Sequence, residues 1–152
     1  MERFDIAIIG SGPAGVSAAL TASLRGKPPL LFGSRTLSDK IAKAQRIQNY
    51  PGLPDVTGPQ LRDALLHHLD VMGVPITEAR VNAVYAMGDY FAIQTAAGTY
   101  EAAAVILATG VVQGKPLPGE QELLGRGVSY CATCDAPLYR GKRVAVVGTS
   151  PA

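Results

Sequence analysis

The stretch that decides the fold is Phe4-Asp5-Ile6-Ala7-Ile8-Ile9-Gly10-Ser11-Gly12-Pro13-Ala14-Gly15. Residues 4–9 are almost wholly apolar, which predicts a buried strand of a parallel sheet. From Pro13 the chain continues as an alanine-rich helix that is expected to end near Gly26. Residues 29–32 predict a second short strand. The opening is therefore a strand–turn–helix–strand unit, which is typical of α/β folds.

The three glycines between the first strand and the helix fit the fingerprint of a dinucleotide-binding turn. Gly10 permits the tight turn, Gly12 lets a pyrophosphate approach the backbone, and Gly15 lets the helix pack closely on the strand. The phosphates would lie at the helix N-terminus, where free N–H groups and the positive end of the helix dipole attract anions. A glycine-rich turn that binds nothing is the alternative. The usual acidic partner of the ribose is missing, because the second strand is followed by Gly33-Ser34-Arg35.

The remaining pattern predicts further helices and strands of one α/β domain. Residues 34–48 are polar with helical stretches, and Asn49-Tyr50-Pro51-Gly52 predicts a turn. An amphipathic helix is expected over residues 58–72, and the leucines on its apolar face are Leu61, Leu65, Leu66 and Leu69. Short strands are expected at residues 74–76, 79–87, 90–95, 99–101, 104–108 and 143–147.

Charge and hydropathy exclude several functional classes. The 152 residues include 14 Lys and Arg against 12 Asp and Glu, and no basic block would follow a nucleic-acid backbone. No apolar stretch approaches the roughly 20 residues of a membrane helix, and no secretory signal opens the chain. We therefore expect a cytoplasmic protein without nucleic acid or membrane partners. In that compartment a pair of cysteines is seldom a structural disulfide.

The two cysteines lie in Cys131-Ala132-Thr133-Cys134-Asp135, a spacing that lets two thiols close a small redox-active ring. A zinc site would need further ligands, and the chain offers no second cysteine pair and two adjacent histidines, His67 and His68. No metal is therefore expected. Two idle buried thiols are the other alternative. Asp135 could donate or accept a proton as the disulfide opens, or could be an ordinary carboxylate near a helix start.

Four segments together resemble the bacterial thioredoxin reductases: residues 10–15, residues 49–52, Ala108-Thr109-Gly110, and Gly125-Arg-Gly-Val-Ser-Tyr-Cys-Ala-Thr-Cys-Asp135. The likeness runs in order across nearly the whole chain. It implies a homodimeric FAD-dependent disulfide oxidoreductase whose Rossmann-like FAD domain, a parallel sheet with a small antiparallel β crossover, is split by an inserted second dinucleotide-binding domain. We expect residues 1–114 to form the first FAD segment and residues 115–152 to begin the inserted NAD(P)-type domain. The chain would then be a fragment of the enzyme.

The resemblance also implies roles for individual residues. Cys134 would face the flavin and receive its electrons, Cys131 would attack the disulfide of thioredoxin or a similar protein, and Asp135 would donate a proton. The FAD contacts would come from Gly10, Ser11, Gly12, Pro13, Ala14, Gly15, Gly33, Lys40, Asn49, Thr109 and Gly110.

Two positions depart from the family pattern. Lys40 stands where the family usually has the glutamine of a Gly-Gly-Gln-Leu segment. At the second fingerprint, Gly148-Thr149-Ser150-Pro151, Ser150 replaces a glycine, and its side chain would obstruct a pyrophosphate. NADPH is one candidate electron donor, and ferredoxin or a second flavin is the alternative. A third interpretation is an inactive FAD-binding fragment.

Overall fold

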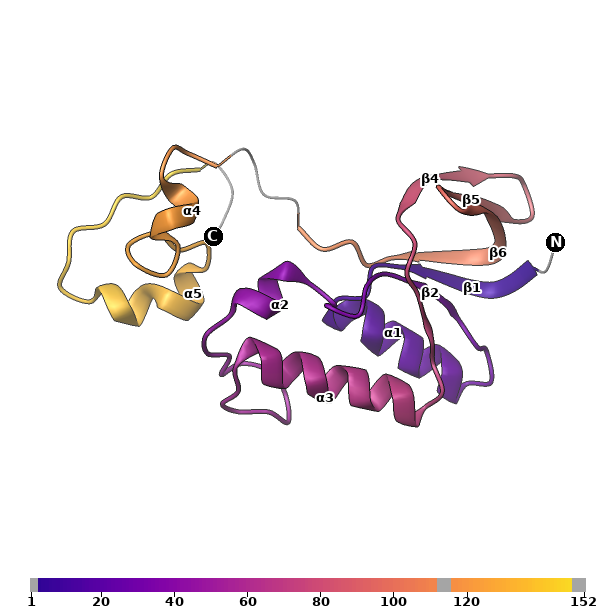
Figure 1. The fold of residues 1–152 in the computed structure, drawn as a ribbon, viewed down its shortest axis with the longest axis horizontal. Helices are drawn as coiled ribbons and strands as arrows, with labels where there is room; N and C mark the ends of the chain where they lie inside the picture. Colours follow the sequence, from indigo (N-terminus) through magenta and orange to yellow (C-terminus); the bar gives the residue numbers. More distant parts are fainter. Residues whose placement is uncertain (1–2, 112–115, 149–152) are drawn as a thin grey trace. The chain divides into compact units, whose positions relative to one another are not determined.

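The computed structural model describes residues 3–111 and 116–148, with Asp39, Thr133 and Cys134 described through their backbone alone. The chain divides into two compact units, Met1–Val111 and Val112–Ala152. The first unit holds the sheet and three helices (Figure 1). The second holds short helices.

The first unit is built on a six-stranded sheet with the strand order β3-β2-β1-β6-β5-β4. Its strands are β1 (Arg3–Ile9), β2 (Leu30–Phe32), β3 (Ile76–Thr77), β4 (Val81–Ala86), β5 (Phe91–Thr95) and β6 (Gly98–Leu107). The first four strands in this order, β3, β2, β1 and β6, pair in parallel with their neighbours. The last three, β6, β5 and β4, pair antiparallel. This confirms the predicted α/β fold with a small antiparallel addition.

β6 corrects one detail of the prediction. Two separate strands were expected at residues 99–101 and 104–108, but the structure has one continuous strand. Its register with β1 runs from the pair Arg3 and Glu101 to the pair Ile9 and Leu107. Because β1 supplies a partner along most of this length, the intervening alanines stay in the ladder.

Three helices belong to the first unit: α1 (Pro13–Leu24), α2 (Asp39–Lys43) and α3 (Gly58–Val71). Figure 1 shows α1 and α3 side by side along the sheet. α3 begins with a capping box, in which the side chains of Thr57 and Gln60 each bond the other residue's backbone N–H. Its predicted apolar face is confirmed, since Leu61, Leu65 and Leu69 are buried and the fourth predicted residue, Leu66, is partly buried against the same core. No helix in the described part of the chain is both long and apolar enough to cross a bilayer.

Successive side chains of a strand point to opposite faces of the sheet, so the core of the first unit consists of two clusters. Ile8 and Leu31 face the helices and join the cluster built on α1 and α3. Ala7 and Phe32 face the other way and pack with Ile93 of β5. The glycine-rich turn follows directly on the carboxyl end of β1, which lies between these two clusters.

The second unit contains α4 (Glu120–Leu123), α5 (Ala132–Asp135) and a 3-10 helix (Ala136–Tyr139). None of the residues from 116 to 148 whose burial is described is buried. The prediction of a strand at residues 143–147 is wrong, because residues 143–148 form neither a helix nor a strand. Val146 is 85% exposed, and no strand in the described part of this unit lies beside it to complete a ladder.

Candidate functional site

The glycine-rich turn is shaped by close backbone contacts. Gly10 has φ +113°, a conformation that favours glycine, and a β-carbon there would lie 2.2 Å from the carbonyl oxygen of Ala108. A β-carbon on Gly15 would lie 1.8 Å from the carbonyl oxygen of Gly10. Both positions therefore require glycine, because the turn is wedged between the start of α1 and the end of β6.

Gly12 differs from these two glycines because no heavy atom lies within 4 Å of a β-carbon built on it. It is the N-cap of α1, no side chain caps the helix there, and no acidic residue occupies the first turn. Pro13 has no N–H, so the first donors free for an anion are the backbone amides that follow. Open space, uncapped amides and the helix dipole at one point fit the diphosphate of a dinucleotide.

The side chain of Ser11 joins this turn to the loop that follows β2. Its buried hydroxyl accepts a hydrogen bond from the Ser34 amide at 2.9 Å and lies 3.0 Å from the Ser34 carbonyl oxygen, to which it can donate. A β-carbon on Gly33 would come within 2.1 Å of the Ser11 oxygen. Leu37, whose carbonyl oxygen is a second acceptor for Ser11 at 3.4 Å, has the unusual φ of +59°. Gly33 therefore gives the Ser11 side chain the room to hold the two loops together.

Residues from two other segments lie at the same end of the sheet. The Lys40 ammonium donates to the Val111 carbonyl oxygen at 2.9 Å, which joins α2 to the segment after β6. The Thr109 amide would lie 3.2 Å from a β-carbon on Gly10, so Thr109 lies against the glycine turn, and Gly110 is the next residue of the chain. In open α/β sheets, ligands bind at the carboxyl ends of the strands. The structure brings the predicted residues 10–15, 33, 40, 109 and 110 to that end.

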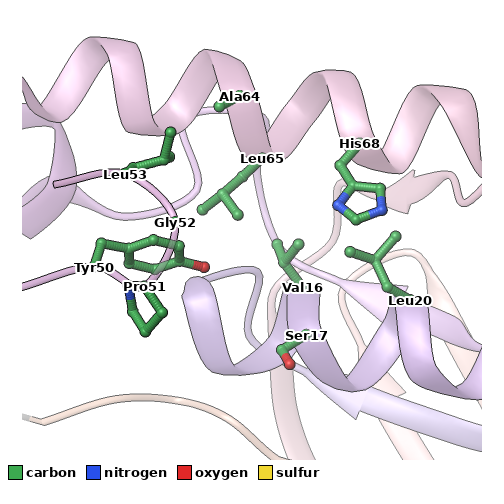
Figure 2. Close-up of a pocket in the computed structure, with 10 residues that line it drawn as sticks. All are labelled: Val16, Ser17, Leu20, Tyr50, Pro51, Gly52, Leu53, Ala64, Leu65 and His68. Carbon is green, nitrogen blue, oxygen red and sulfur yellow. The ribbon is translucent and has the colours of Figure 1, made fainter. Parts of the chain in front are cut away.

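Asn49 is exposed and precedes the turn at residues 50–53. Figure 2 shows Tyr50 and Pro51 of this turn on one side of an open pocket, with Val16 of α1 and His68 of α3 along its wall. The turn that follows Asn49 thus lines the same pocket as the helix that begins at the glycine turn. Among the described residues the Asn49 side chain makes no hydrogen bond to residues 10–15.

An ion pair joins the two ends of the segment that contains this turn, residues 46–55. Arg46 donates to both carboxylate oxygens of Asp55, with Nε–Oδ1 at 2.8 Å and Nη2–Oδ2 at 3.0 Å. The hydrogen bond from Arg46 lowers the pKa of the Asp55 carboxyl and raises the pKa of the guanidinium. Ile47 and Val56 pair through their backbones beside it. Sequence reasoning missed this pair, although opposite charges on both sides of a Pro-Gly turn were a readable signal.

The cysteine segment is organised by Ser129. Cys131 is half-buried and disulfide-bonded, and its amide donates to the Ser129 hydroxyl oxygen at 3.0 Å. The same hydroxyl donates to Oδ2 of Asp135 at 2.6 Å. The structure therefore brings Asp135 and Cys131 together through a residue that sequence reasoning missed. The side chain of Cys134 lies outside the described residues, as do residues 149–151 of the second fingerprint.

Glu120 links α4 to the residue before Cys131. Its carboxylate accepts hydrogen bonds from the Tyr130 hydroxyl and from the Leu117 amide. The Tyr130 hydrogen bond lowers the pKa of Glu120 and raises the pKa of the Tyr130 phenol. No cluster of three or more His, Cys, Asp or Glu that could hold a metal occurs in the described part of the chain.

Comparison with known proteins places these features in one family. The profile of the pyridine nucleotide-disulphide oxidoreductases matches residues 4–151. The bifunctional thioredoxin reductase/thioredoxin of Mycobacterium leprae is 42% identical over 147 residues, which are 95% of this chain and 32% of that protein. The thioredoxin reductase of Bacillus subtilis is 36% identical over 146 residues, which are 95% of this chain and 46% of that protein.

A solved structure gives a further comparison. The crystal structure of a ferredoxin-flavin thioredoxin reductase from Clostridium acetobutylicum matches with a TM-score of 0.74 and 57% sequence identity. The match covers 99% of this chain and 52% of that chain. This chain thus spans about a third to about half the length of the relatives that it matches.

Proposed function

The chain belongs to the pyridine nucleotide-disulphide oxidoreductase family, and we propose that it supplies the FAD-binding turn and the redox-active dithiol of a thioredoxin-disulfide reductase. The observation that carries the proposal is the unobstructed, uncapped start of α1 at Gly12. Both curated relatives named above are called thioredoxin reductases. Cys131 and Cys134 supply the residue types that the reduction of a protein disulfide requires.

The cofactor assignment follows from the room at the glycine turn. The diphosphate of FAD would lie against Gly12, where the amides of Ala14 and Gly15 are near the open helix start. Ser11 and Gly33 would fix the adjoining loop, and Lys40, Asn49, Thr109 and Gly110 would complete the contacts predicted from the sequence. A bound FAD, once reduced by the electron donor, would supply the two electrons that open the Cys131–Cys134 disulfide.

The dithiol then reduces its substrate in two exchanges. The Cys131 thiolate attacks one sulfur of the thioredoxin disulfide, so a mixed disulfide forms and a thioredoxin thiolate leaves with the proton of the Asp135 carboxylic acid. Cys134 next attacks Cys131, the mixed disulfide breaks, and the enzyme disulfide forms again. The proton of the Cys134 thiol passes through Asp135 to the second leaving thiolate. Two electrons and two protons have then reached thioredoxin.

The architecture of the working enzyme is part of the same proposal. Residues 1–114 would be the first segment of the FAD domain, and residues 115–152 would begin an inserted NAD(P)-type domain. The enzyme would be a homodimer, as the resemblance to thioredoxin reductases implies. Thiol chemistry of this kind requires a reducing compartment, so we place the protein in the cytoplasm.

The electron donor has two candidates, and two observations favour ferredoxin over NADPH. The relative at 57% identity is named a ferredoxin-flavin thioredoxin reductase. Ser150 and Pro151 also stand where a nicotinamide dinucleotide would need bare backbone. We therefore propose that NADPH reduces the flavin poorly and that a one-electron protein donor of the ferredoxin class replaces it.

The activity is tested with cysteine variants of the flavoprotein. Cys131→Ser should leave flavin reduction intact and abolish thioredoxin reduction, whereas Cys134→Ser should stop the electrons one step earlier, between flavin and disulfide. The measurements are flavin absorbance and the appearance of thioredoxin thiols. Normal thioredoxin turnover by either variant would exclude the assignment.

Anaerobic stopped-flow mixing separates the two donors. The flavin of the wild-type protein should bleach slowly or not at all with excess NADPH or NADH, and rapidly with reduced ferredoxin. Complete bleaching by NADPH at the rate of thioredoxin turnover would reject the ferredoxin proposal and identify an NADPH enzyme.

A further inference from the structure

The hydroxyl of Ser129 is the centre of a small hydrogen-bond cluster beside the dithiol. It accepts from the Cys131 amide at 3.0 Å, and it lies 2.6 Å from Asp135 Oδ2 and 3.3 Å from the Cys131 carbonyl oxygen. A serine hydroxyl has one hydrogen, so these two acceptors compete for it. Asp135 Oδ2 is the closer acceptor, at 2.6 Å against 3.3 Å, and a bond to it gains further strength when the carboxyl group gives up its proton, because charge-assisted O–H···O⁻ bonds are about twice as strong as neutral ones. Ser129 therefore donates to Asp135.

The backbone alone does not orient the Asp135 carboxylate. The Asp135 amide donates to the Cys131 carbonyl oxygen at 3.0 Å, which fixes the Asp135 backbone one helical turn from Cys131. An aspartate side chain on a fixed backbone still has three staggered positions about its first torsion. The hydroxyl of Ser129 selects the one in which the carboxylate lies on the side of the Cys131 amide. Ser129, Cys131 and Asp135 are all half-buried, so water competes less for these bonds than on an open surface.

We infer that Ser129 is a positioning residue that holds the carboxyl group of Asp135 beside Cys131 for proton transfer to the leaving thiolate. The inference rests on the thioredoxin reduction proposed above. When Asp135 gives up its proton, the Ser129 hydroxyl is already placed to donate to the carboxylate that remains. The same hydroxyl holds the Cys131 amide, so one side chain sets the position of the attacking residue and of the proton donor.

The size of the effect follows from the two roles. A positioned general acid contributes roughly 100-fold or more to a proton-coupled step, which is the loss expected for Asp135→Asn. Ser129→Ala keeps the carboxyl group but releases it to about three rotamers. We therefore expect the rate of thioredoxin reduction to fall by about 3- to 30-fold in Ser129→Ala. Ser129→Thr keeps a hydroxyl and should recover most of that loss.

The test is a double-mutant cycle in the flavoprotein with thioredoxin as substrate, in which flavin-to-disulfide electron transfer is followed separately. In the Asp135→Asn background, Ser129→Ala should cause less than about a twofold further loss, because Ser129 acts through Asp135. Equal losses in both backgrounds, no loss in Ser129→Ala, or no recovery by Ser129→Thr would each overturn the inference. Far-UV circular dichroism and flavin content show that the variants fold.

The wild-type protein serves as the control that distinguishes a failure of this inference from a failure of the proposed function. If the wild type reduces thioredoxin and both serine variants reduce it equally well, the inference fails and the proposed function stands. If the wild type transfers no electrons to thioredoxin from a reduced flavin, both fail.

Discussion

Two alanine substitutions in the glycine turn should separate its role in folding from its role in flavin binding. Gly12→Ala adds a methyl group where no heavy atom lies within 4 Å, at a φ of −67° that any residue adopts. Gly15→Ala adds the same group 1.8 Å from the Gly10 carbonyl oxygen and 2.9 Å from its carbon. The two sites are three residues apart, so each variant is a control for the other.

The magnitudes follow from these distances. Alanine is a poorer N-cap than glycine by roughly 0.5–1 kcal/mol, but it also restricts the unfolded chain, which stabilises by about 0.4–1 kcal/mol. Gly12→Ala should therefore leave the free energy of unfolding within about 0.5 kcal/mol of the wild type. The Gly15 methyl must displace backbone, an overpacking cost of about 1–3 kcal/mol. At about 4 °C per kcal/mol for a unit of this size, Gly15→Ala should lower Tm by about 4–12 °C.

Gly12→Ala should weaken flavin binding although it leaves the stability unchanged. A methyl group in the space assigned to the diphosphate should raise the Kd of FAD at least about tenfold, or about 1.4 kcal/mol. The assay is FAD titration of the apoprotein by fluorescence, beside thermal unfolding of the apoprotein by circular dichroism. Wild-type FAD affinity in Gly12→Ala would refute the assignment of the diphosphate to this turn. A wild-type Tm in Gly15→Ala would refute the close packing of the turn.

Three further substitutions test the fold, the ion pair of Arg46 and Asp55, and the hydrogen bond of Tyr130 and Glu120. Leu69→Ala removes a side chain that is 1% exposed and should lower the free energy of unfolding by about 2–5 kcal/mol in urea denaturation, and a loss below about 1 kcal/mol would contradict the core assignment. Asp55→Asn should loosen the segment that carries Asn49 and raise the Kd of FAD several-fold, with Asp63→Asn on the surface of α3 as the control that should change nothing. Tyr130→Phe should speed hydrogen exchange of residues 117–130 at pH 7, and wild-type exchange would show that the Glu120 contact orders nothing.

The pH dependence of that contact has a definite sign. Hydrogen bonds to Glu120 lower its pKa below the ordinary value of 4.5, so the contact is fully present above that pH and is lost as the pH falls through the lowered value. The raised pKa of Tyr130 preserves the phenol proton above its ordinary value of 10.0. The protection factors of residues 117–130, which are corrected for the intrinsic pH dependence of amide exchange, should therefore be constant near neutrality and fall only below about pH 4.5. The same loss of protection in Tyr130→Phe at pH 7 would identify the hydrogen bond as its cause.

The sequence predicted the first unit well because its signals are local and agree with one another. Ile8 and Leu31 lie in short apolar runs bounded by glycine, and the leucines of α3 repeat at helical spacing, so strand, helix and core follow from pattern alone. The strand predicted at residues 143–147 depended on the same kind of run, and Val146 remains exposed. An apolar run is a strand only where another strand pairs with it, and pairing is not a local property.

The site divides in a similar way. Gly10, Gly12 and Gly15 follow from a motif whose backbone geometry is the same wherever it occurs, and their packing was readable in advance. Ser129 and the pair of Arg46 and Asp55 were not, because their roles depend on which side chains meet after the loops close. Polar residues in loops carry weak sequence signals, since their partners are set by tertiary contacts.

Electron flow from the flavin to the cysteine pair is the central claim, and anaerobic thiol trapping tests it most directly. One two-electron equivalent is given photochemically to the flavin of the wild-type protein, a thiol-alkylating reagent is added, and the labelled residues are located by mass spectrometry. We predict that Cys131 and Cys134 are both alkylated and that the flavin spectrum returns to the oxidised form. A flavin that stays reduced, with both cysteines unlabelled and still joined as a disulfide, would contradict the account.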